Sequence, residues 1–383
     1  MAIQFPIYLD NQASTPLDPR VFKAMQPWMG EKYGNPHSEH TFGWMGRAEI
    51  DIAREDIARL IGAKPEEILF TSGATEANNL AIKGIAETFR GKKDKIVTVK
   101  TEHKCVLESA KYVGRNGSTV TFLGVKKDGL LDPDKLREAV DDKTAFVSVM
   151  AVNNEIGVIQ DVAEIGAICR EKGALFHTDA AQAFGKIPLD VEAMNIDLLS
   201  VSGHKIYGPV GVGALYARKK VQRLLTPQMS GGGQEAHIRS GTLSPALCVG
   251  FGKAAAIAAE EMTAEAQRMK AMYGHFMEVL KTASNRISVN GSEEARWFGN
   301  LNLTFEGVRA DLLVAAVKKI AVSTASACST GDAGPSHVLS ALGLKEEELE
   351  ASIRIGFGRF TTREQADFAA HYILEVLDQL RGR

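Results

Sequence analysis

From about residue 66 onward, short apolar runs rich in β-branched and aromatic residues alternate with longer stretches of helical periodicity. The strand-like runs are EEILFT, KIVTV, AFVSVM, ALFHTD and IDLLSVS, and the helical stretches between them include ATEANNLAIKGIAETF, CVLESAKYV and VAEIGAICREKG. Strands that alternate with helices form a mostly parallel sheet covered on both faces. The sequence therefore predicts an α/β fold, and in such sheets ligands bind outside the carboxyl ends of the strands.

The remainder of the chain predicts a second, smaller α/β unit. GVGALYAR favours one more strand of the first sheet, antiparallel to the others, after a Gly-Pro turn. Residues 244–283 are helical for most of their length and are expected to connect the two units. From Arg286 onward, short strands (RISVN, NLNLTF and ASIRIGF) alternate again with helices, the last of which is TREQADFAAHYILEVLDQLR.

Length and composition fit two domains with their own cores: the chain has 383 residues, of which 45% are hydrophobic and 24% charged. The four cysteines lie too far apart for a zinc or disulfide motif, so we expect no metal and single thiols in a reducing compartment. They are Cys105, Cys169, Cys248 and Cys328.

Charge and hydropathy exclude two classes of partner. A formal net charge of -2 gives no general attraction to nucleic acid or to anionic membranes. No apolar run reaches the roughly 18 residues of a membrane span. The first residues, MAIQFPIYLD, lack the basic region and long apolar core of a signal peptide, so we expect a cytoplasmic protein.

The segment FTSGATEANN contains a strand end, a glycine turn and a helix start. The free backbone N–H groups of Gly73, Ala74 and Thr75, together with the helix dipole, suit a phosphate group. A plain capped helix explains the same residues, and for this motif alone it is the more frequent outcome.

Other strand ends carry polar residues that are ambiguous one by one. Asp179 and Gln182 follow one strand, where a carboxylate often caps the next turn. Ser202, His204 and Lys205 follow another strand, and a lysine placed there between glycines faces a cleft more often than bulk solvent. His103 and Asn154 end two further strands, where a hydrogen-bonded structural histidine or a turn-forming asparagine is also consistent.

Taken together, these residues match the needs of pyridoxal phosphate. That cofactor requires a lysine for a Schiff base, an acid for the pyridinium nitrogen and an anchor for its phosphate. Its ring also requires a flat partner on one face.

At this point a family resemblance is clear. The chain resembles the cysteine desulfurases of the NifS/IscS type, in the class V aminotransferase family with the type I pyridoxal-phosphate fold. The matching motifs run almost from end to end: YLDNQASTP, GNPHS, TSGATEANNLAIKG, TEHK, VNNEIGVIQD, HTDAAQ, SGHKIYGPVGVGALY, RSGT, SACSTG and SIRIGFGRFTT. The resemblance implies a large cofactor-binding domain over residues 15–257 and a small domain over 1–14 with 258–383 that carries the Cys328 loop.

The resemblance also implies a role for each matched residue. Lys205 would form the Schiff base, His103 would stack on the ring and shuttle protons, Asp179 would pair with the pyridinium nitrogen, and Gln182 would bond the ring hydroxyl. Gly73, Ala74, Thr75, Ser202 and His204 would hold the phosphate, and Thr242 would reach the phosphate of a neighbouring subunit in a homodimer. Arg354 would bind the substrate carboxylate with its bidentate fork, and Asn154 would assist near the ring and the carboxylate.

Cys328 lies among small and flexible residues in SACSTGDAG, which is unlike the setting of a packed core cysteine. The resemblance implies that its thiolate attacks the sulfur of L-cysteine, so that alanine leaves and Cys328 becomes a persulfide. Glycines around it would let the loop carry that sulfur to an acceptor protein such as an iron–sulfur scaffold.

Three alternatives remain open from the sequence. A selenocysteine lyase would use the same site, whereas another class V enzyme such as a transaminase has no use for a cysteine in this loop. A catalytically inactive scaffold is disfavoured because Lys205, His103, Asp179 and Cys328 occur together. Cys105 departs from the family pattern, and we expect it to pack on the following helix.

Overall fold

Seven strands form the central sheet of the computed structural model, which describes residues 3–284, 286–324 and 334–382. In sheet order they are β2 (Ile68–Thr71), β8 (Gly213–Ala217), β7 (Leu198–Ser202), β6 (Leu175–Asp179), β5 (Thr144–Ser148), β3 (Lys95–Val99) and β4 (Thr119–Leu123). The strands from β7 to β4 pair in parallel, and β8 is antiparallel to both of its neighbours. The mostly parallel sheet and the reversed strand are thus confirmed. The edge strand β4 was not predicted, because its half-exposed TVTFL has no continuous apolar run.

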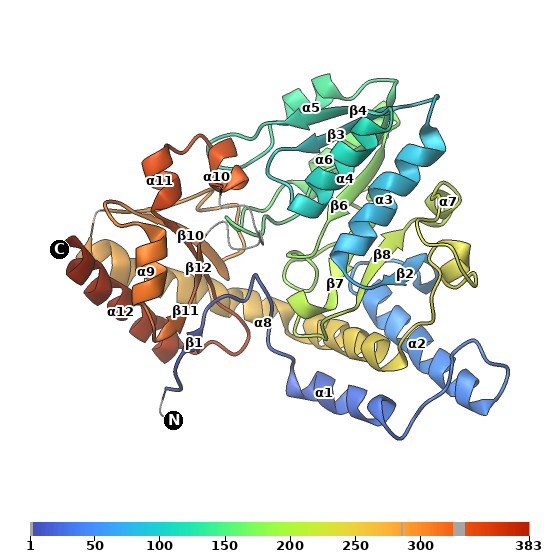
Figure 1. Ribbon diagram of the computed structural model, residues 1–383, viewed down its shortest axis with the longest axis horizontal. Helices are drawn as coiled ribbons and strands as arrows, with labels where there is room; N and C mark the ends of the chain where they lie inside the picture. The colour runs from blue at the N-terminus through green and yellow to red at the C-terminus, as the bar shows by residue number, and fades with distance from the viewer. Residues whose placement is uncertain (1–2, 285, 325–333, 383) are drawn as a thin grey trace.

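Helices cover both faces of this sheet, as the alternation along the strands requires (Figure 1). Ile96 of β3 and Leu198 of β7 pack in one cluster with α3 (Ala74–Phe89) and α4 (Lys104–Arg115). Their neighbours Val97 and Leu199 point to the opposite face. There they pack in a second cluster with α2 (Thr41–Arg59), α6 (Val162–Lys172) and α8 (Pro245–Ala283).

A smaller sheet forms the second α/β unit. Its antiparallel order is β12 (Ser323–Thr324), β13 (Ser352–Gly356), β10 (Asn300–Phe305) and β9 (Ile287–Val289). A short pair beside it joins β1 (Ile7–Tyr8) to β11 (Ile320–Ala321) in parallel, so the first residues of the chain lie with its last third. The helices of this unit are α9 (Ala310–Ala316), α10 (His337–Ala341), α11 (Glu346–Glu350) and α12 (Arg363–Arg381).

The long helix α8 runs from one unit to the other (Figure 1), as expected for residues 244–283. The domain boundaries given above stay a prediction. The shorter elements are α1 (Pro19–Met25), η1 (Gln26–Met29), η2 (Pro65–Glu67), α5 (Pro133–Ala139), η3 (Gly203–Lys205), α7 (Lys219–Gln222) and η4 (Glu235–His237). In the three described ranges, no helix is long and apolar enough to cross a membrane.

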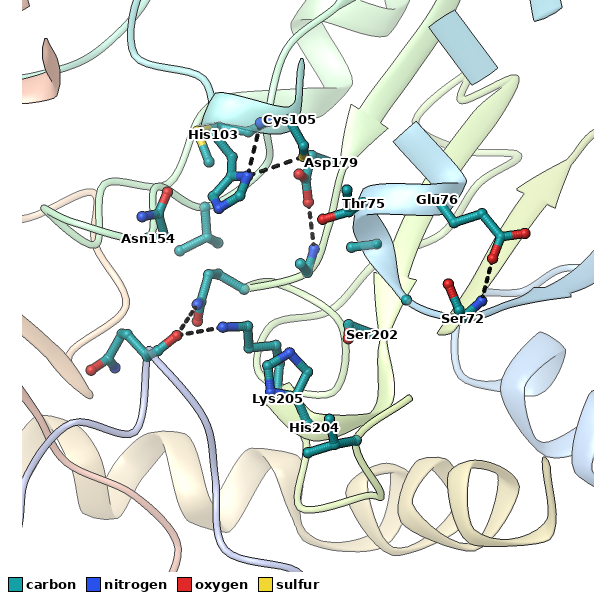
Figure 2. Close-up of a pocket in the computed structure, with 18 of the residues that line it drawn as sticks. Ser72, Thr75, Glu76, His103, Cys105, Asn154, Asp179, Ser202, His204 and Lys205 are labelled. Atoms are coloured by element: carbon teal, nitrogen blue, oxygen red, sulfur yellow. Dashed lines mark hydrogen bonds between the residues drawn. The ribbon is translucent and has the colours of Figure 1, made fainter. Parts of the chain in front are cut away.

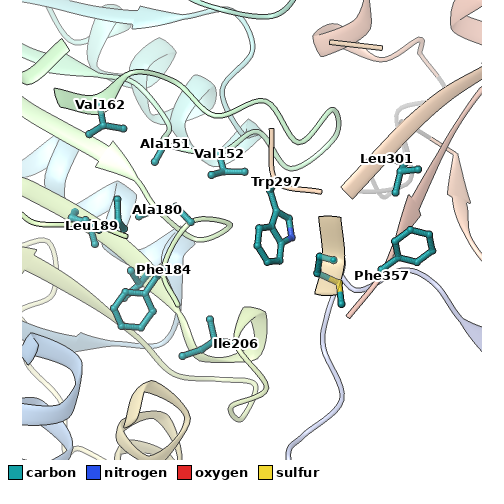
Figure 3. Packing of buried hydrophobic residues seen from close by; sticks show 14 of the residues in the cluster. Ala151, Val152, Val162, Ala180, Phe184, Leu189, Ile206, Trp297, Leu301 and Phe357 are labelled. Carbon is teal, nitrogen blue, oxygen red and sulfur yellow. The ribbon is translucent and has the colours of Figure 1, made fainter. Parts of the chain in front are cut away.

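An apolar contact joins the loop after β5 to the second sheet. Trp297 lies between Val152 on one side and Leu301 and Phe357 on the other (Figure 3), and its backbone N–H donates to Gly157 O at 2.8 Å. Gly157 has a φ of +72°, and a Cβ there would stand 3.0 Å from the carbonyl oxygen of Asn300. Glycine is therefore needed for this close approach.

A buried ionic cluster makes a second joint. Arg359, which follows β13, donates to Asp18 at 3.1 Å and to Glu265 of α8 at 3.0 Å. Its guanidinium lies 4.2 Å from the ring centre of Tyr207, two residues after the end of η3. The turn that carries Lys205 is thereby tied to the second unit.

Candidate active site

A cavity of about 390 Å³ opens at the carboxyl ends of β2, β3, β5, β6 and β7 (Figure 2). Its lining residues come from the segments that follow these strands and from two other stretches of the chain. They are Gln12, Ser72, Gly73, Ala74, Thr75, Glu76, His103, Cys105, Met150, Val152, Asn154, Asp179, Ala181, Gln182, Ser202, His204, Lys205, Val210 and Gly211. The structure therefore brings together most of the polar residues predicted from the strand ends.

The start of α3 forms one wall of the cavity. Gly73 has a φ of +152°, and a Cβ on it would stand 3.8 Å from the hydroxyl of Ser202. The first backbone N–H groups of an α-helix have no acceptor within the helix, and the helix dipole makes its N-terminus attractive to anions. Glu76 in the same turn does not carry an unpaired charge, because Arg239 pairs with it at 2.6 Å.

Lys205 reaches the cavity from the short η3 helix after β7. Its ammonium group donates to the carbonyl oxygens of Gln12 at 2.7 Å and Ala13 at 2.8 Å, which fixes the N-terminal segment against the sheet. The neighbouring His204 lies 3.1 Å from the hydroxyl of Ser14 through Nδ1. Burial, followed by the charges of Lys205 and Lys186, lowers the pKa of His204 to about 4, so this imidazole is neutral near pH 7.

Asp179 ends β6 with both carboxylate oxygens occupied. One oxygen accepts from the backbone N–H of Ala181 at 2.9 Å, and the other accepts from the Asn78 amide at 2.7 Å. Two donors hold the carboxylate in one orientation at the cavity wall. Asn78 of α3 is fully buried and was not predicted as a site residue.

His103 is the N-cap of α4, and its ring projects toward the cavity (Figure 2). Its Nδ1 accepts from the backbone N–H of Cys105 at 3.2 Å and lies 3.0 Å from the Cys105 sulfur. Burial lowers the pKa of His103, with Lys205 acting in the same direction and Asp179 against it. Cys105 packs against the cluster of α3 and α4, as expected, and it also lines the cavity.

Gln182 and Asn154 both line the cavity with their side-chain amides. The Gln182 amide nitrogen donates to Gln12 O at 2.9 Å, and its oxygen accepts from the buried Lys186 at 2.7 Å. Burial lowers the pKa of Lys186 to about 7, and the charge of Lys205 acts in the same direction. The Asn154 side-chain oxygen is buried without a hydrogen-bond partner among the described residues, although Asn154 lines the cavity.

Arg354 comes from the second sheet, in the middle of β13, and only 1% of its surface is exposed. Its guanidinium pairs with Asp10 at 2.8 Å and donates to the carbonyl oxygen of Asn154 at 3.1 Å. Arg354 does not line the cavity itself, but it contacts Asn154, which does. Thr242 is exposed and does not line this cavity in the single chain, and Cys328 lies outside the described residues.

Four residues of this region were missed by the sequence reasoning as site residues: Gln12, Asn78, Cys105 and Lys186. Gln12 lies in the motif YLDNQASTP and Asn78 in TSGATEANNLAIKG, so the matched motifs were the available signal for both. For Lys186, only its position four residues after Gln182 on the same segment pointed to a contact.

Comparisons with known proteins agree with this geometry. The sequence pattern of the aminotransferase class-V family matches residues 7–368. The cysteine desulfurase IscS of Rickettsia bellii (strain OSU 85-389) is 51% identical over 377 residues, which cover 98% of this chain and 92% of the relative.

Two solved structures are similar over more than nine-tenths of this chain. A protein named NifS-like has a TM-score of 0.92 and 36% identity, with 98% of this chain and 100% of that chain covered. A structure of SspA in complex with cysteine has a TM-score of 0.83 and 37% identity, with 93% and 100% covered.

Proposed function

The chain belongs to the aminotransferase class-V family and is a cysteine desulfurase, and we propose that the cavity described above binds pyridoxal phosphate and takes sulfur from L-cysteine. The family depends on that cofactor, and the SspA structure contains cysteine itself. The single observation that carries the proposal for this chain is the convergence of Lys205, Asp179 and His103 on one cavity at the N-terminus of α3.

The residues present fit the cofactor. Lys205 supplies the amine for covalent attachment, and Asp179 is a doubly anchored carboxylate for a pyridinium nitrogen. The start of α3, with Ser202 facing Gly73, offers the donors that a phosphate requires. The unpartnered oxygen of Asn154 is a buried acceptor at the same cavity, and a bound polar group would satisfy it.

Bound pyridoxal phosphate supplies an electron sink for the carbon that bears the amino group of cysteine. The protein residues supply binding and proton movement around it. Asp179 stabilises the positive charge of the pyridinium nitrogen. His204 offers a neutral imidazole. The Gln182 amide is held in place by its hydrogen bond with Lys186. His103 or Lys205 takes the proton from that carbon, since both lie on the cavity wall.

Arg354 is proposed to bind the carboxylate of the substrate. Its pair with Asp10 and its bond to Asn154 O orient the guanidinium beside the cavity residue Asn154. A planar fork held in this way matches the two oxygens of a carboxylate.

Cys328 is proposed to accept the sulfur. Its thiolate attacks the substrate sulfur, an S–S bond forms while the C–S bond breaks, and the electron pair of that bond stays with the carbon, which takes up a proton. Cys328–SH and cysteine thereby give Cys328–S–SH and alanine, so the step consumes no external oxidant or reductant.

Three further predictions concern the surroundings of the enzyme. We expect a homodimer in which the exposed Thr242 reaches the phosphate site of the partner, and a sulfur-accepting protein such as an iron–sulfur scaffold. A cytoplasmic location remains the prediction made from the sequence.

The proposed function is tested by product analysis. The purified protein with pyridoxal phosphate, L-cysteine and a reducing thiol should release alanine and sulfide in equal amounts. Pyruvate and ammonia in place of alanine would show that the site eliminates sulfide from cysteine rather than transferring its sulfur.

A further inference from the structure

Cys105 lies inside the cavity and has no role in the reaction as proposed. Its sulfur is 3.0 Å from His103 Nδ1 and 3.2 Å from the amide nitrogen of Asn78 (Figure 2 shows the contact with His103). Thr75 also forms a side-chain hydrogen bond with this thiol. The directions of the bonds to Asn78 and His103 can be worked out from their neighbours.

The amide of Asn78 fixes the first direction. Its nitrogen donates to Asp179 at 2.7 Å, and the opposite amide orientation would place two oxygens against each other. The second hydrogen of this nitrogen therefore points to Cys105, and the sulfur accepts it.

The start of α4 fixes the second direction. The backbone N–H of Cys105 can only donate, and it donates to His103 Nδ1 at 3.2 Å. Nδ1 thus carries a lone pair rather than a proton. Because Nδ1 then has no proton to donate, the 3.0 Å contact assigns the proton to the thiol, whose S–H shares the single Nδ1 lone pair with the backbone N–H.

We propose that Cys105 is a positioning residue: its thiol relays hydrogen bonding from Asn78 to His103 and holds the His103 imidazole neutral, with its proton on Nε2. Asp179 and His103 are in this way connected through two side chains, Asn78 and Cys105. Nε2 is the ring nitrogen left for a ligand in the cavity. This inference rests on the proposed function only in assigning that ligand to the desulfurase reaction.

The thiol is suited to hydrogen bonding and unsuited to sulfur transfer. Burial, and then the negative charge of Asp179, raise the pKa of Cys105 to about 12, so a thiolate is almost absent near pH 7. A protonated thiol keeps the S–H that the relay requires. Cys105 therefore does not replace Cys328 as the sulfur acceptor.

Four charged or titratable groups near His103 also influence its pKa. They are Asp179, Lys205, His337 and Lys104. None of these groups changes in a Cys105 variant, so a difference between variants reports on the thiol itself.

The relay is tested by nitrogen NMR of the histidine rings in full-length protein, with and without added pyridoxal phosphate. The His103 signals, assigned by their loss in His103→Gln, should show an unprotonated Nδ1 and a protonated Nε2 in both states. A protonated Nδ1 at neutral pH would overturn the proposal.

Two variants of Cys105 separate the effect of its hydrogen bond to His103 from the effect of its packing. Alanine and serine differ only by the hydroxyl that can donate this bond. Cys105→Ala removes a donor to neutral His103 and should raise the measured pKa of that histidine by about 0.5 to 1 pH unit. Cys105→Ser restores a donor and should return the pKa toward the wild-type value. Equal pKa values in all three proteins would contradict the relay.

The thiol can also be observed directly through its S–H stretching band in the infrared. The wild type minus Cys105→Ala difference should show a band displaced to low frequency, as for a donating thiol, while Cys248→Ala serves as the matched buried control. A band at the frequency of a free thiol would overturn the proposal. None of these measurements depends on turnover, so the relay can fail while the desulfurase activity is confirmed, and the reverse.

Discussion

The two sheets contribute to the site in different ways. The seven-stranded sheet presents its residues at and just beyond the carboxyl ends of its strands, so that Asp179 and Lys205 line the cavity. The four-stranded sheet contributes Arg354 from within a strand, almost fully buried and already paired with Asp10. The large sheet thus provides an open set of groups that can receive a cofactor, whereas the small sheet provides one rigid cation that can select a carboxylate.

The joint between the sheets decides whether these two contributions meet. Trp297 and the Arg359 cluster both lie at this joint, and Asn154 belongs to the site and also accepts from Arg354. A comparison of the two regions therefore predicts separable effects: cofactor binding from the large sheet, substrate binding from the small sheet, and stability from the joint.

The largest effect is expected at Lys205. Lys205→Ala removes the only amine proposed for covalent attachment of the cofactor, so alanine formation should fall by about 10⁴-fold or more, as for other essential catalytic groups. The absorbance of the attached cofactor should disappear with it. The exposed Lys220→Ala is the control and should remain active. Near wild-type turnover in Lys205→Ala would show that Lys205 does not attach the cofactor and that the large sheet does not supply the catalytic amine.

The joint is tested by Arg359→Ala. The change leaves Glu265 as a buried carboxylate without its cation, while Asp18 keeps its pair with Arg20, and the free energy of unfolding should fall by about 3–5 kcal/mol. Chemical denaturation measures this loss. In the control Arg309→Ala, a solvent-exposed pair with Asp311 is removed, and the denaturation midpoint should not move. Equal behaviour of the two variants would show that the Arg359 cluster does not join the units.

Lys186 gives a pH-dependent effect confined to the large sheet. Because burial lowers its folded pKa to about 7 from 10.5, the unfolded chain binds more protons between these values, and stability should rise with pH across this window. Lys186→Met lacks this titration. Its stability relative to wild type should therefore be higher at pH 6.5 than at pH 10, by a few kcal/mol. An equal difference at both pH values would mean that Lys186 is charged in the folded protein.

The sequence predicted what local patterns determine. Lys205, Asp179 and His103 each follow an apolar strand, and the carboxyl ends of parallel strands meet at one edge of a sheet. Their common cavity could therefore be expected from the order of strands and helices along the chain. The reversed strand β8 was also predictable from the turn that precedes it.

Contacts between distant side chains could not be predicted in the same way. The bond from Asn78 to Asp179 spans 101 residues, and the pair of Arg354 with Asp10 spans 344. Both depend on how a helix or strand is rotated in the finished fold. Cys105 is only two residues from His103, but its sulfur contact with that ring depends on the geometry of the α4 N-terminus, which no sequence pattern specifies.

The assignment of cofactor binding to the large sheet and substrate binding to the small sheet is tested most directly by Arg354→Lys. Two quantities are measured in this variant: the KM for L-cysteine and the dissociation constant of pyridoxal phosphate. Lysine keeps the charge but loses the bidentate fork, so the KM for L-cysteine should rise by about tenfold. The dissociation constant of pyridoxal phosphate should stay at the wild-type value, because no cofactor contact is proposed for β13. An unchanged KM, or an equal loss of cofactor affinity, would contradict the assignment of cofactor to the large sheet and substrate to the small one.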